Sequence, residues 1–347
     1  MKSLNALSDN PQFRRTGLYR SFMDRPLGFI DIGAAGGVHP LVTPAASLTH
    51  CICFEPGEEA YRDLLKKYES GSPFSRVTII NSAVGAGTAQ ETLHVTRSLV
   101  NTSLLEPRYE MVTRYRLEGF RVEKTLPLLT GSLDEIILNE RKGEGLSGEF
   151  IKLDCQGAEY SILKGAEKTL ESCMAIMCEA AFFQMYKGQK LFADLDSSMR
   201  ERGFQLYGLW PRYVSSKRLD RRIYDSEERI IEVDALYFRD PLDVVNSTRE
   251  FTERNIEVLL LVSILSRFYD FALELVDNFF SGKEDERRRL TDCIHELSGR
   301  YRESLENDTI KLLDDLNSSP EKTYLLCKKF IDRHKSNNSV DFVKLQD

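Results

Sequence analysis

The 347-residue sequence predicts an α/β fold in which a doubly wound sheet is followed by a C-terminal α-helical extension. The length exceeds that of one ordinary domain, which favours two structural units. From residue 28 to about residue 240, short continuous apolar runs alternate with amphipathic stretches, as they do where helices join buried parallel strands. Residues 242–347 contain few Gly or Pro and are rich in Leu, Glu, Lys, Arg and Asp, which is typical of helices.

Seven apolar runs predict the strands of the sheet. They lie at residues 29–32, 51–54, 77–80, 150–153, 175–178, 204–209 and 233–238. The stretches 58–68 and 160–170 repeat apolar residues at helical spacing, so we expect crossover helices there. Residues 88–126 interrupt this alternation with segments of alternating polar and apolar residues, which predicts an inserted β-hairpin or flap that faces the substrate.

On this interpretation the chain has three parts: a helical lead-in at 1–27, a sheet domain at 28–241 and a helical domain at 242–347. In the helical domain we expect helices at about 248–280, 284–317 and 320–334. The first of these is apolar on more than one face. Its surface therefore needs cover, either from the chain itself or from a second copy in a homodimer.

The composition is that of a soluble globular protein, with 41% hydrophobic and 29% charged residues. A net charge of −7 opposes any general attraction to nucleic acid. The N-terminus lacks the apolar run of a secretory signal, and the most apolar later stretch, residues 258–276, includes charged residues. We therefore expect a cytoplasmic protein without a membrane span.

The first predicted strand leads into a glycine turn suited to a cofactor. Asp31 ends the strand, Gly33 and Gly37 lie in the turn, and Glu55 follows the second strand. Ligands of open α/β sheets bind at this edge, where glycines let the backbone come close and a carboxylate can hold both ribose hydroxyls. An adenine would lie at the end of the third strand, at residues 81–83.

Dinucleotides and S-adenosylmethionine both use such a site, and the glycine spacing separates them. The dinucleotide fingerprint G-x-G-x-x-G needs a second glycine where this chain has Ala35, and Asp31 would direct negative charge at the pyrophosphate. A cationic sulfonium with an amino-acid tail suits the acid better. We favour S-adenosylmethionine, and a nicotinamide oxidoreductase stays as an alternative.

At residues 28–240 the sequence resembles the FkbM family of S-adenosylmethionine-dependent methyltransferases. The resemblance rests on the runs FIDIGAAGG, CFEP, NSAVG, TGSLDEI, FIKLDCQGAEYSILKGAEKTL and IMCEAAF, which occur in the family's order. It implies a class I methyltransferase fold, a Rossmann-like, seven-stranded sheet whose last strand is antiparallel. It also implies O-methylation of a hydroxyl on a saccharide, a polyketide-like compound or another polar metabolite.

Carried over by position, the resemblance implies that Asp31, Gly33 and Gly37 line the methionine end of the cofactor. Glu55 would bind the ribose, and Ser82 and Ala83 the adenine. The chain departs from the family at Gln156, where many members have Glu, which argues against a mechanism with two carboxylates at that position.

Asp154, at the carboxyl end of the fourth strand, is the candidate catalytic residue. It could orient or deprotonate the acceptor hydroxyl, or else contact the cofactor ammonium or cap the helix that begins near Ala158. Glu159, in the first turn of that helix, has a structural role on this interpretation. Asp154 and Glu179 would end neighbouring strands, so Mg²⁺ bound by both is a less favoured alternative.

A basic and aromatic segment at 210–222 is the candidate substrate-binding loop. Arg212 and Arg218 could bind an anionic group, and Tyr213 could pack on a sugar face. Nearby acids also allow a solvated loop without such a role. The expected partner is a small-molecule or glycan acceptor, and the second function class is an inactive methyltransferase fold that serves as a binding or assembly module.

Overall fold

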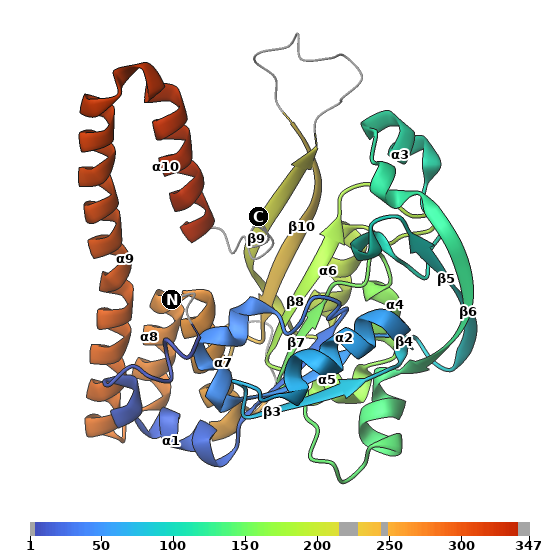
Figure 1. Cartoon of the computed structure of the whole chain (residues 1–347). Coiled ribbons are helices and arrows are strands. Elements are labelled where there is room, and N and C mark those ends of the chain that lie inside the picture. Colours follow the sequence, from blue (N-terminus) through green and yellow to red (C-terminus); the bar gives the residue numbers. More distant parts are fainter. Residues whose placement is uncertain (1–3, 215–227, 244–248, 339–347) are drawn as a thin grey trace. The chain divides into compact units, whose positions relative to one another are not determined.

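The computed structural model describes residues 4–214, 228–243 and 249–338 (Figure 1). The chain folds into two compact units. The sheet unit consists of Arg25–His39 and Ala46–Leu259, and the helical unit of Met1–Asp24, Pro40–Ala45 and Leu260–Asp347. This division differs from the expected one, because the N-terminal segment folds with the C-terminal helices and the sheet unit extends beyond residue 241.

The seven predicted strands form one sheet in the order β3-β2-β1-β7-β8-β10-β9, which confirms the α/β fold. All neighbouring pairs are parallel except those of β10, which runs antiparallel to both β8 and β9. The last strand along the chain is therefore the antiparallel one, as expected. The strands are β1 Leu27–Ile32, β2 Thr49–Phe54, β3 Arg76–Ile80, β7 Phe150–Leu153, β8 Ala175–Ala181, β9 Gln205–Val214 and β10 Arg229–Phe238.

Alternate side chains of the strands enter different layers. One core contains Ile30, Ile52 and Ile151 together with residues of the helices α4 Glu159–Lys164, α5 Glu167–Ser172 and α6 Phe192–Glu201 and the π-helix η5 Glu135–Glu140. The helix α2 Glu58–Glu69 buries Leu64, and the N–H of Val38, in the turn after β1, donates a hydrogen bond to the Tyr68 hydroxyl. The 3₁₀ segment η2 Pro40–Leu48 joins β1 to β2.

The insertion forms a second sheet. β5 Ala89–Thr96 pairs antiparallel with β6 Val122–Ser132, which confirms the expected hairpin, and β4 Ala83–Gly85 pairs parallel with β6. The polar middle of the insertion contains the short helix α3 Tyr109–Tyr115 between the 3₁₀ turns η3 Leu99–Asn101 and η4 Glu118–Phe120. This middle also contributes Tyr115 to a small core with Phe183 and Tyr186, next to the ends of β8 and β10.

The helix predicted at 160–170 is interrupted at Gly165. It forms α4 and α5, with Gly165 between them. A Cβ at position 165 would lie 2.4 Å from the Gly85 carbonyl oxygen, so the backbone of β4 passes where a continuous helix would carry a side chain. The close approach of β4, which helical spacing does not report, therefore requires glycine at this position.

In the helical unit, the helix predicted at 248–280 is also two helices. They are α7 Glu253–Ser266, whose first residues belong to the sheet unit, and α8 Tyr269–Phe279. Arg267 has φ +69°, its N–H donates to Ile264, and the Phe268 N–H donates to Ser263. This is the Schellman pattern that ends helices. Every residue of α7 from Val258 is buried, so its apolar surface is covered within the chain.

The remaining helices are α1 Gly17–Asp24, α9 Glu284–Ser318 and α10 Thr323–Asn338, with the 3₁₀ turns η1 Phe13–Arg15 and η7 Pro320–Lys322. Glu286 of α9 accepts hydrogen bonds from the N–H groups of Gly17 and Leu18, at 2.6 Å and 3.3 Å. A carboxylate at the N-terminus of α1 satisfies two of its free N–H groups and favours the helix dipole. This contact explains why the N-terminal segment folds with the C-terminal helices.

None of the helices in the described ranges is both long and apolar enough to cross a membrane.

Candidate active site

The glycine turn after β1 allows an unusually close approach of two strand ends. Gly33 has φ +86°, and a Cβ there would lie 2.0 Å from the carbonyl oxygen of Asp154. Gly37 has φ +118°, which also favours glycine, whereas a Cβ at Gly36 would meet no atom within 4 Å. The turn is therefore fixed on one side by β7 and open at Gly36.

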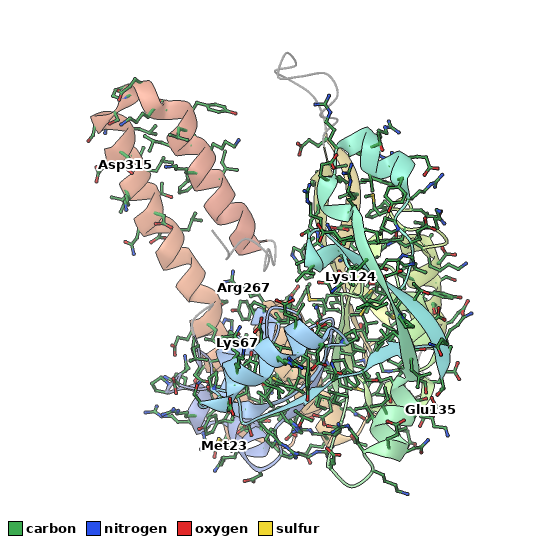
Figure 2. The ribbon with its side chains drawn as sticks, turned by 45° about the vertical axis from the view of Figure 1, so that its right-hand side comes forward. Met23, Lys67, Lys124, Glu135, Arg267 and Asp315 are labelled. Atoms are coloured by element: carbon green, nitrogen blue, oxygen red, sulfur yellow. The ribbon has the colours of Figure 1, made fainter. Side chains whose placement is uncertain are left out.

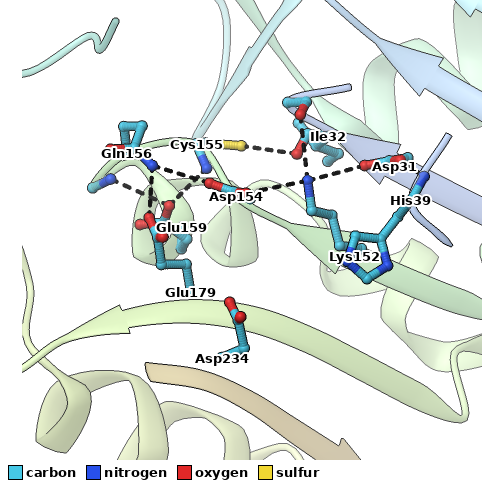
Figure 3. A network of polar contacts seen from close by, with 12 residues as sticks. Asp31, Ile32, His39, Lys152, Asp154, Cys155, Gln156, Glu159, Glu179 and Asp234 are labelled. Carbon is cyan, nitrogen blue, oxygen red and sulfur yellow. Dashed lines mark hydrogen bonds and ion pairs between the residues drawn. The ribbon is translucent and has the colours of Figure 1, made fainter. Parts of the chain in front are cut away.

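Asp31 and Lys152 form a buried ion pair beneath this turn (Figure 3). They are register partners on β1 and β7, and Lys152 Nζ lies 3.2 Å from Asp31 Oδ1. The other oxygen, Oδ2, accepts a 2.8 Å hydrogen bond from the N–H of His39. Asp31 is fully buried, and this burial raises its pKa, although Lys152 acts in the opposite direction. Direct contact with a cofactor ammonium would require this ion pair to open.

Glu55 lies at the carboxyl end of the neighbouring strand, β2. Its Oε1 accepts a 2.8 Å hydrogen bond from the N–H of Gly57, and Oε2 has no hydrogen-bond partner in the described part of the chain. Burial raises the pKa of Glu55. The Asn81 side chain donates to the Glu55 carbonyl oxygen and so ties this strand end to Ser82 and Ala83, which follow β3.

Asp154, directly after β7, is the candidate catalytic carboxylate, and its side chain is 36% exposed. Oδ2 lies 3.5 Å from Lys152 Nζ, and Oδ1 accepts a 3.0 Å hydrogen bond from Gln156. Burial acts to raise its pKa, but Lys152 and Arg212 outweigh burial and hold the pKa below the ordinary value. Asp154 is therefore an ionised carboxylate that a ligand can reach.

Gln156 connects Asp154 to β8 and to the insertion. Its side-chain N–H groups donate to Asp154 and, at 2.8 Å, to Glu179, and its side-chain oxygen accepts a 2.9 Å hydrogen bond from the Tyr186 hydroxyl. The Ser103 hydroxyl in the insertion donates to the Gln156 carbonyl oxygen at 2.7 Å. Gln156 adopts φ +52°, a left-handed conformation that is uncommon outside glycine and is held here by these contacts.

Arg212 lies in β9 rather than in an open loop, and three carboxylates surround its guanidinium. It is hydrogen-bonded to Glu179, to Glu232 at 2.7 Å and to Asp234 at 3.0 Å. Burial raises the pKa of Asp234 to about 6. Tyr213, next in the strand, is 55% exposed. Arg218, the third predicted substrate-binding residue, lies outside the described residues.

Glu159 is buried at the start of α4 and folds back onto the preceding loop. Its Oε1 accepts hydrogen bonds from the N–H groups of Cys155 and Gly157, at 2.8 Å and 3.2 Å. Burial raises its pKa to about 7. These contacts fit the structural role expected of Glu159, because they hold the loop that carries Asp154 and Gln156.

Within the described ranges, no three His, Cys, Asp or Glu side chains are arranged to hold a metal ion. The alternative of Mg²⁺ on Asp154 and Glu179 meets a specific obstacle, because Arg212 and Gln156 already occupy the Glu179 carboxylate. A cation at Glu179 would have to displace a guanidinium.

Several residues of this network were not among the predicted ones. Lys152 could have been found, because it stands two residues before Asp154 in a strand and so projects from the same face. Tyr186 and Ser103 gave no such signal, because they reach Gln156 from loops distant in sequence.

A family model described as methyltransferase FkbM domain matches residues 31–206. Solved structures with low similarity include M. capricolum TrmK in complex with S-adenosyl-homocysteine, at 8% identity over 81% of this chain and 95% of that one, with a TM-score of 0.31. Magnesium protoporphyrin IX methyltransferase (ChlM) from Synechocystis PCC 6803 with bound SAM is 10% identical over 64% of this chain and 89% of that one, with a TM-score of 0.28.

A SAM-dependent methyltransferase from Agrobacterium tumefaciens is 10% identical over 64% of this chain and 60% of that one, with a TM-score of 0.32. Comparison with curated proteins gives no match. The family match covers just over half of the chain, including the glycine turn, Glu55 and Asp154. On that ground, the chain belongs to the FkbM methyltransferase domain family.

Proposed function

We propose that this protein transfers a methyl group from S-adenosylmethionine to a hydroxyl of a saccharide or another polar metabolite. The observation that carries the proposal is Asp154, an accessible carboxylate kept ionised by Lys152 and Arg212 beside the glycine turn. Membership of a methyltransferase family supports the reaction class.

The residues at the strand ends fit this cofactor. The open space at Gly36 would admit a ligand close to the backbone, and Glu55 Oε2 is free to accept hydrogen bonds from ribose hydroxyls. In this proposal Asp31 acts through the turn that it holds. The cofactor-binding set is Asp31, Gly33, Gly37, Glu55, Ser82 and Ala83.

When bound, S-adenosylmethionine supplies an electrophilic methyl group on a sulfonium. Asp154 accepts a hydrogen bond from the acceptor hydroxyl, which orients the oxygen for in-line attack. As the new O–CH₃ bond forms and the S–CH₃ bond breaks, the hydroxyl proton passes to Asp154. A carboxylate with a lowered pKa is a weak base, so its main contribution is orientation, with proton transfer late in the reaction.

The residues around Asp154 keep it in position. Gln156 fixes Oδ1. Arg212 pairs with Glu179, which keeps a negative charge at Glu179 from raising the pKa of Asp154. We therefore assign Arg212 to this ion network. Tyr213 remains the described candidate for contact with a sugar face, and Arg218 a candidate for an anionic group. Gln156 and Arg212 already occupy both oxygens of Glu179, so the proposed reaction uses no Mg²⁺.

The proposal is tested in two steps with the purified full chain. Isothermal titration with S-adenosylhomocysteine should show binding, and Glu55→Ala should weaken it by about 1.5–3 kcal/mol, the scale of hydrogen bonds to charged groups. Transfer of labelled methyl groups into a panel of saccharides and polar metabolites should then identify the acceptor. Asp154→Asn should reduce turnover much more than S-adenosylhomocysteine affinity. Equal losses in both would assign Asp154 to cofactor binding.

The alternatives give different results in the same experiments. A nicotinamide oxidoreductase would bind NADH and not S-adenosylhomocysteine. An inactive binding module would bind S-adenosylhomocysteine without methylating any member of the panel.

A further inference from the structure

The C-terminal hairpin, which we define as residues 305–331 of α9, η7 and α10, leaves large apolar side chains in water. The two helices pack against each other in opposite directions. Yet Ile310, Leu313, Tyr324 and Ile331 are 59%, 55%, 80% and 54% exposed. In Figure 2, side chains project outward from both helices of the hairpin. Within the described residues of the helical unit, no segment covers these side chains.

The two helices of the hairpin face each other along one line of side chains, which we call the inner seam, and they enclose no core. The residues that the helices bury against each other are half-buried at most: Leu305, Leu312, Leu316, Leu326, Cys327 and Phe330. No residue from 305 to 331 is fully buried. Helix pairs gain most of their stability from tertiary packing, so this hairpin needs a further surface against it.

The four exposed residues lie on one side of the hairpin. Each residue of an α-helix is rotated by about 100° about the helix axis relative to the one before it. Measured in this way from the middle of the inner seam, Ile310 and Leu313 lie about 80–140° around α9. Tyr324 and Ile331 lie about 95–115° around α10 from its seam, in the same sense. Because the helices are antiparallel, the same sense of rotation brings both pairs to one face. Leu325, which is 48% exposed, lies on the other side.

The two helices carry opposite charges. In residues 305–318, α9 has Glu306, Asp308, Asp314 and Asp315 against one Lys311. The described side chains of η7 and α10 include Lys322, Lys328 and Lys329 against one Glu321. An apolar face with an acidic helix beside a basic one is complementary to itself when rotated by a two-fold axis.

We propose that this face binds the same face of a second copy of the chain, forming an antiparallel four-helix bundle. With the two-fold axis along the helices, α9 of each copy packs against α10 of the other, and every neighbouring pair is antiparallel. Residues that lie the same number of positions from the turn are at the same level of the bundle. Leu316 is therefore level with Leu326, and Leu312 with Phe330. The same count brings Asp314 to the level of Lys328 of the partner subunit.

The first test is the molar mass of the full chain by light scattering after gel filtration. The wild type should have twice the 39.8 kDa of one chain. Ile310→Glu with Ile331→Glu should halve that mass, because it places charges in the bundle core. Leu325→Glu is the matched control, on the same hairpin and with similar exposure but on the other side, and it should leave the dimer intact. Circular dichroism checks that helix content is unchanged.

The second test reverses the charges. Asp314→Lys alone and Lys328→Asp alone should each shift the dimer toward monomer, and the two together should restore it. Restoration requires both residues to meet in a second copy, which no other partner predicts. A monomeric wild type, a monomeric Leu325→Glu variant or a failure of the double variant to recover would overturn the proposal. Monomers that co-sediment with vesicles containing anionic lipid would assign the face to a membrane surface instead.

Discussion

At Gln156, one side-chain amide separates two carboxylates. Asp154 and Glu179 both accept hydrogen bonds from its Nε2, and both lie in a cluster with Glu232 and Asp234. Carboxylates this close raise one another's pKa unless donors lie between them. The amide of Gln156 supplies such donors, which makes Gln156 a positioning residue for Asp154.

Gln156→Glu replaces the donor with a third carboxylate, so the pKa of Asp154 should rise. We expect the acid limb of the pH profile of kcat/KM to move up by about one pH unit, with S-adenosylhomocysteine affinity unchanged. Ser103→Ala is the control, because it removes the hydrogen bond to the Gln156 carbonyl and leaves the carboxylates as they are. An unchanged profile in Gln156→Glu would show that the amide does not govern Asp154.

Glu159 should make stability depend on pH. Its folded-state pKa of about 7 lies above the ordinary 4.5, so the folded state favours the neutral acid. The contribution of Glu159 to the free energy of unfolding therefore falls by at most roughly 3 kcal/mol as the pH rises from 4.5 to about 7. Above that pH it is constant. In Glu159→Gln, the amide oxygen can keep both hydrogen bonds without the buried charge.

Urea unfolding of Glu159→Gln should therefore lose part of the pH dependence seen in the wild type between about pH 4.5 and pH 7. The exposed Glu167→Gln serves as the control and should leave that dependence unchanged. A variant that follows the wild-type pH curve would mean that Glu159 does not titrate in this range.

The sequence predicted the positions of the site residues better than their partners. Asp31, Glu55 and Asp154 end strands, and strand ends meet at one edge of a parallel sheet, so their gathering follows from the apolar runs alone. That Arg212 pairs with Glu232 follows from the register of β9 on β10, which the composition of the 210–222 segment does not encode.

At the scale of elements, all seven strands of the main sheet were predicted, and two helix breaks were not. Helical spacing of apolar residues continues through Gly165 and Arg267, because the residues on either side still face a core. The break at Gly165 lies where the β4 backbone passes close by, and the one at Arg267 contains a left-handed residue that a single sequence does not reveal.

Gly165→Ala tests the close approach of β4 at the first of these breaks. Gly165 has an ordinary φ of −92°, so the cost is steric: the new Cβ would lie 2.4 Å and 3.0 Å from the carbonyl oxygens of Gly85 and Ala86. We expect a loss of about 1–3 kcal/mol in the free energy of unfolding, measured in urea. Gly282→Ala, where the Cβ meets nothing within 4 Å, should cost little or stabilise slightly. Equal effects would contradict the steric account.

At the scale of the whole chain, the sheet unit depends on residues beyond the predicted boundary at 241. Arg254 of α7 makes two 2.8 Å hydrogen bonds to Glu149, whose side chain is 4% exposed and also accepts the N–H of Gly28. The amino-acid composition changes at Pro241. The cation that pairs with Glu149, the buried carboxylate hydrogen-bonded to β1, is Arg254, thirteen residues after Pro241. The boundary in the fold is set by this ion pair.

Arg254→Met should destabilise the chain by about 3 kcal/mol, because among the described residues it leaves the buried Glu149 carboxylate with only one cation, the more exposed Arg25. Combining it with Glu149→Gln should recover part of the loss, since the uncompensated charge is then gone. Arg62→Met, which breaks the exposed pair with Glu58, should cost under about 1 kcal/mol. Urea unfolding of the three variants measures this, and an Arg254→Met loss no larger than that of Arg62→Met would refute the assignment.

The contact between Glu286 and the start of α1 also affects the order in which the two units fold during synthesis. Ribosomes release a chain from its N-terminus at roughly 5–20 residues per second. Leu18 and Glu286 are separated by 268 residues, so α1 emerges roughly 13 to 54 seconds before the group that caps it. During that interval Leu18 and Phe22, both buried in the finished fold, lack the helices of their own unit. The sheet unit can assemble while α1 still lacks α9, so α1 is synthesised before most of the sheet unit and folds after it.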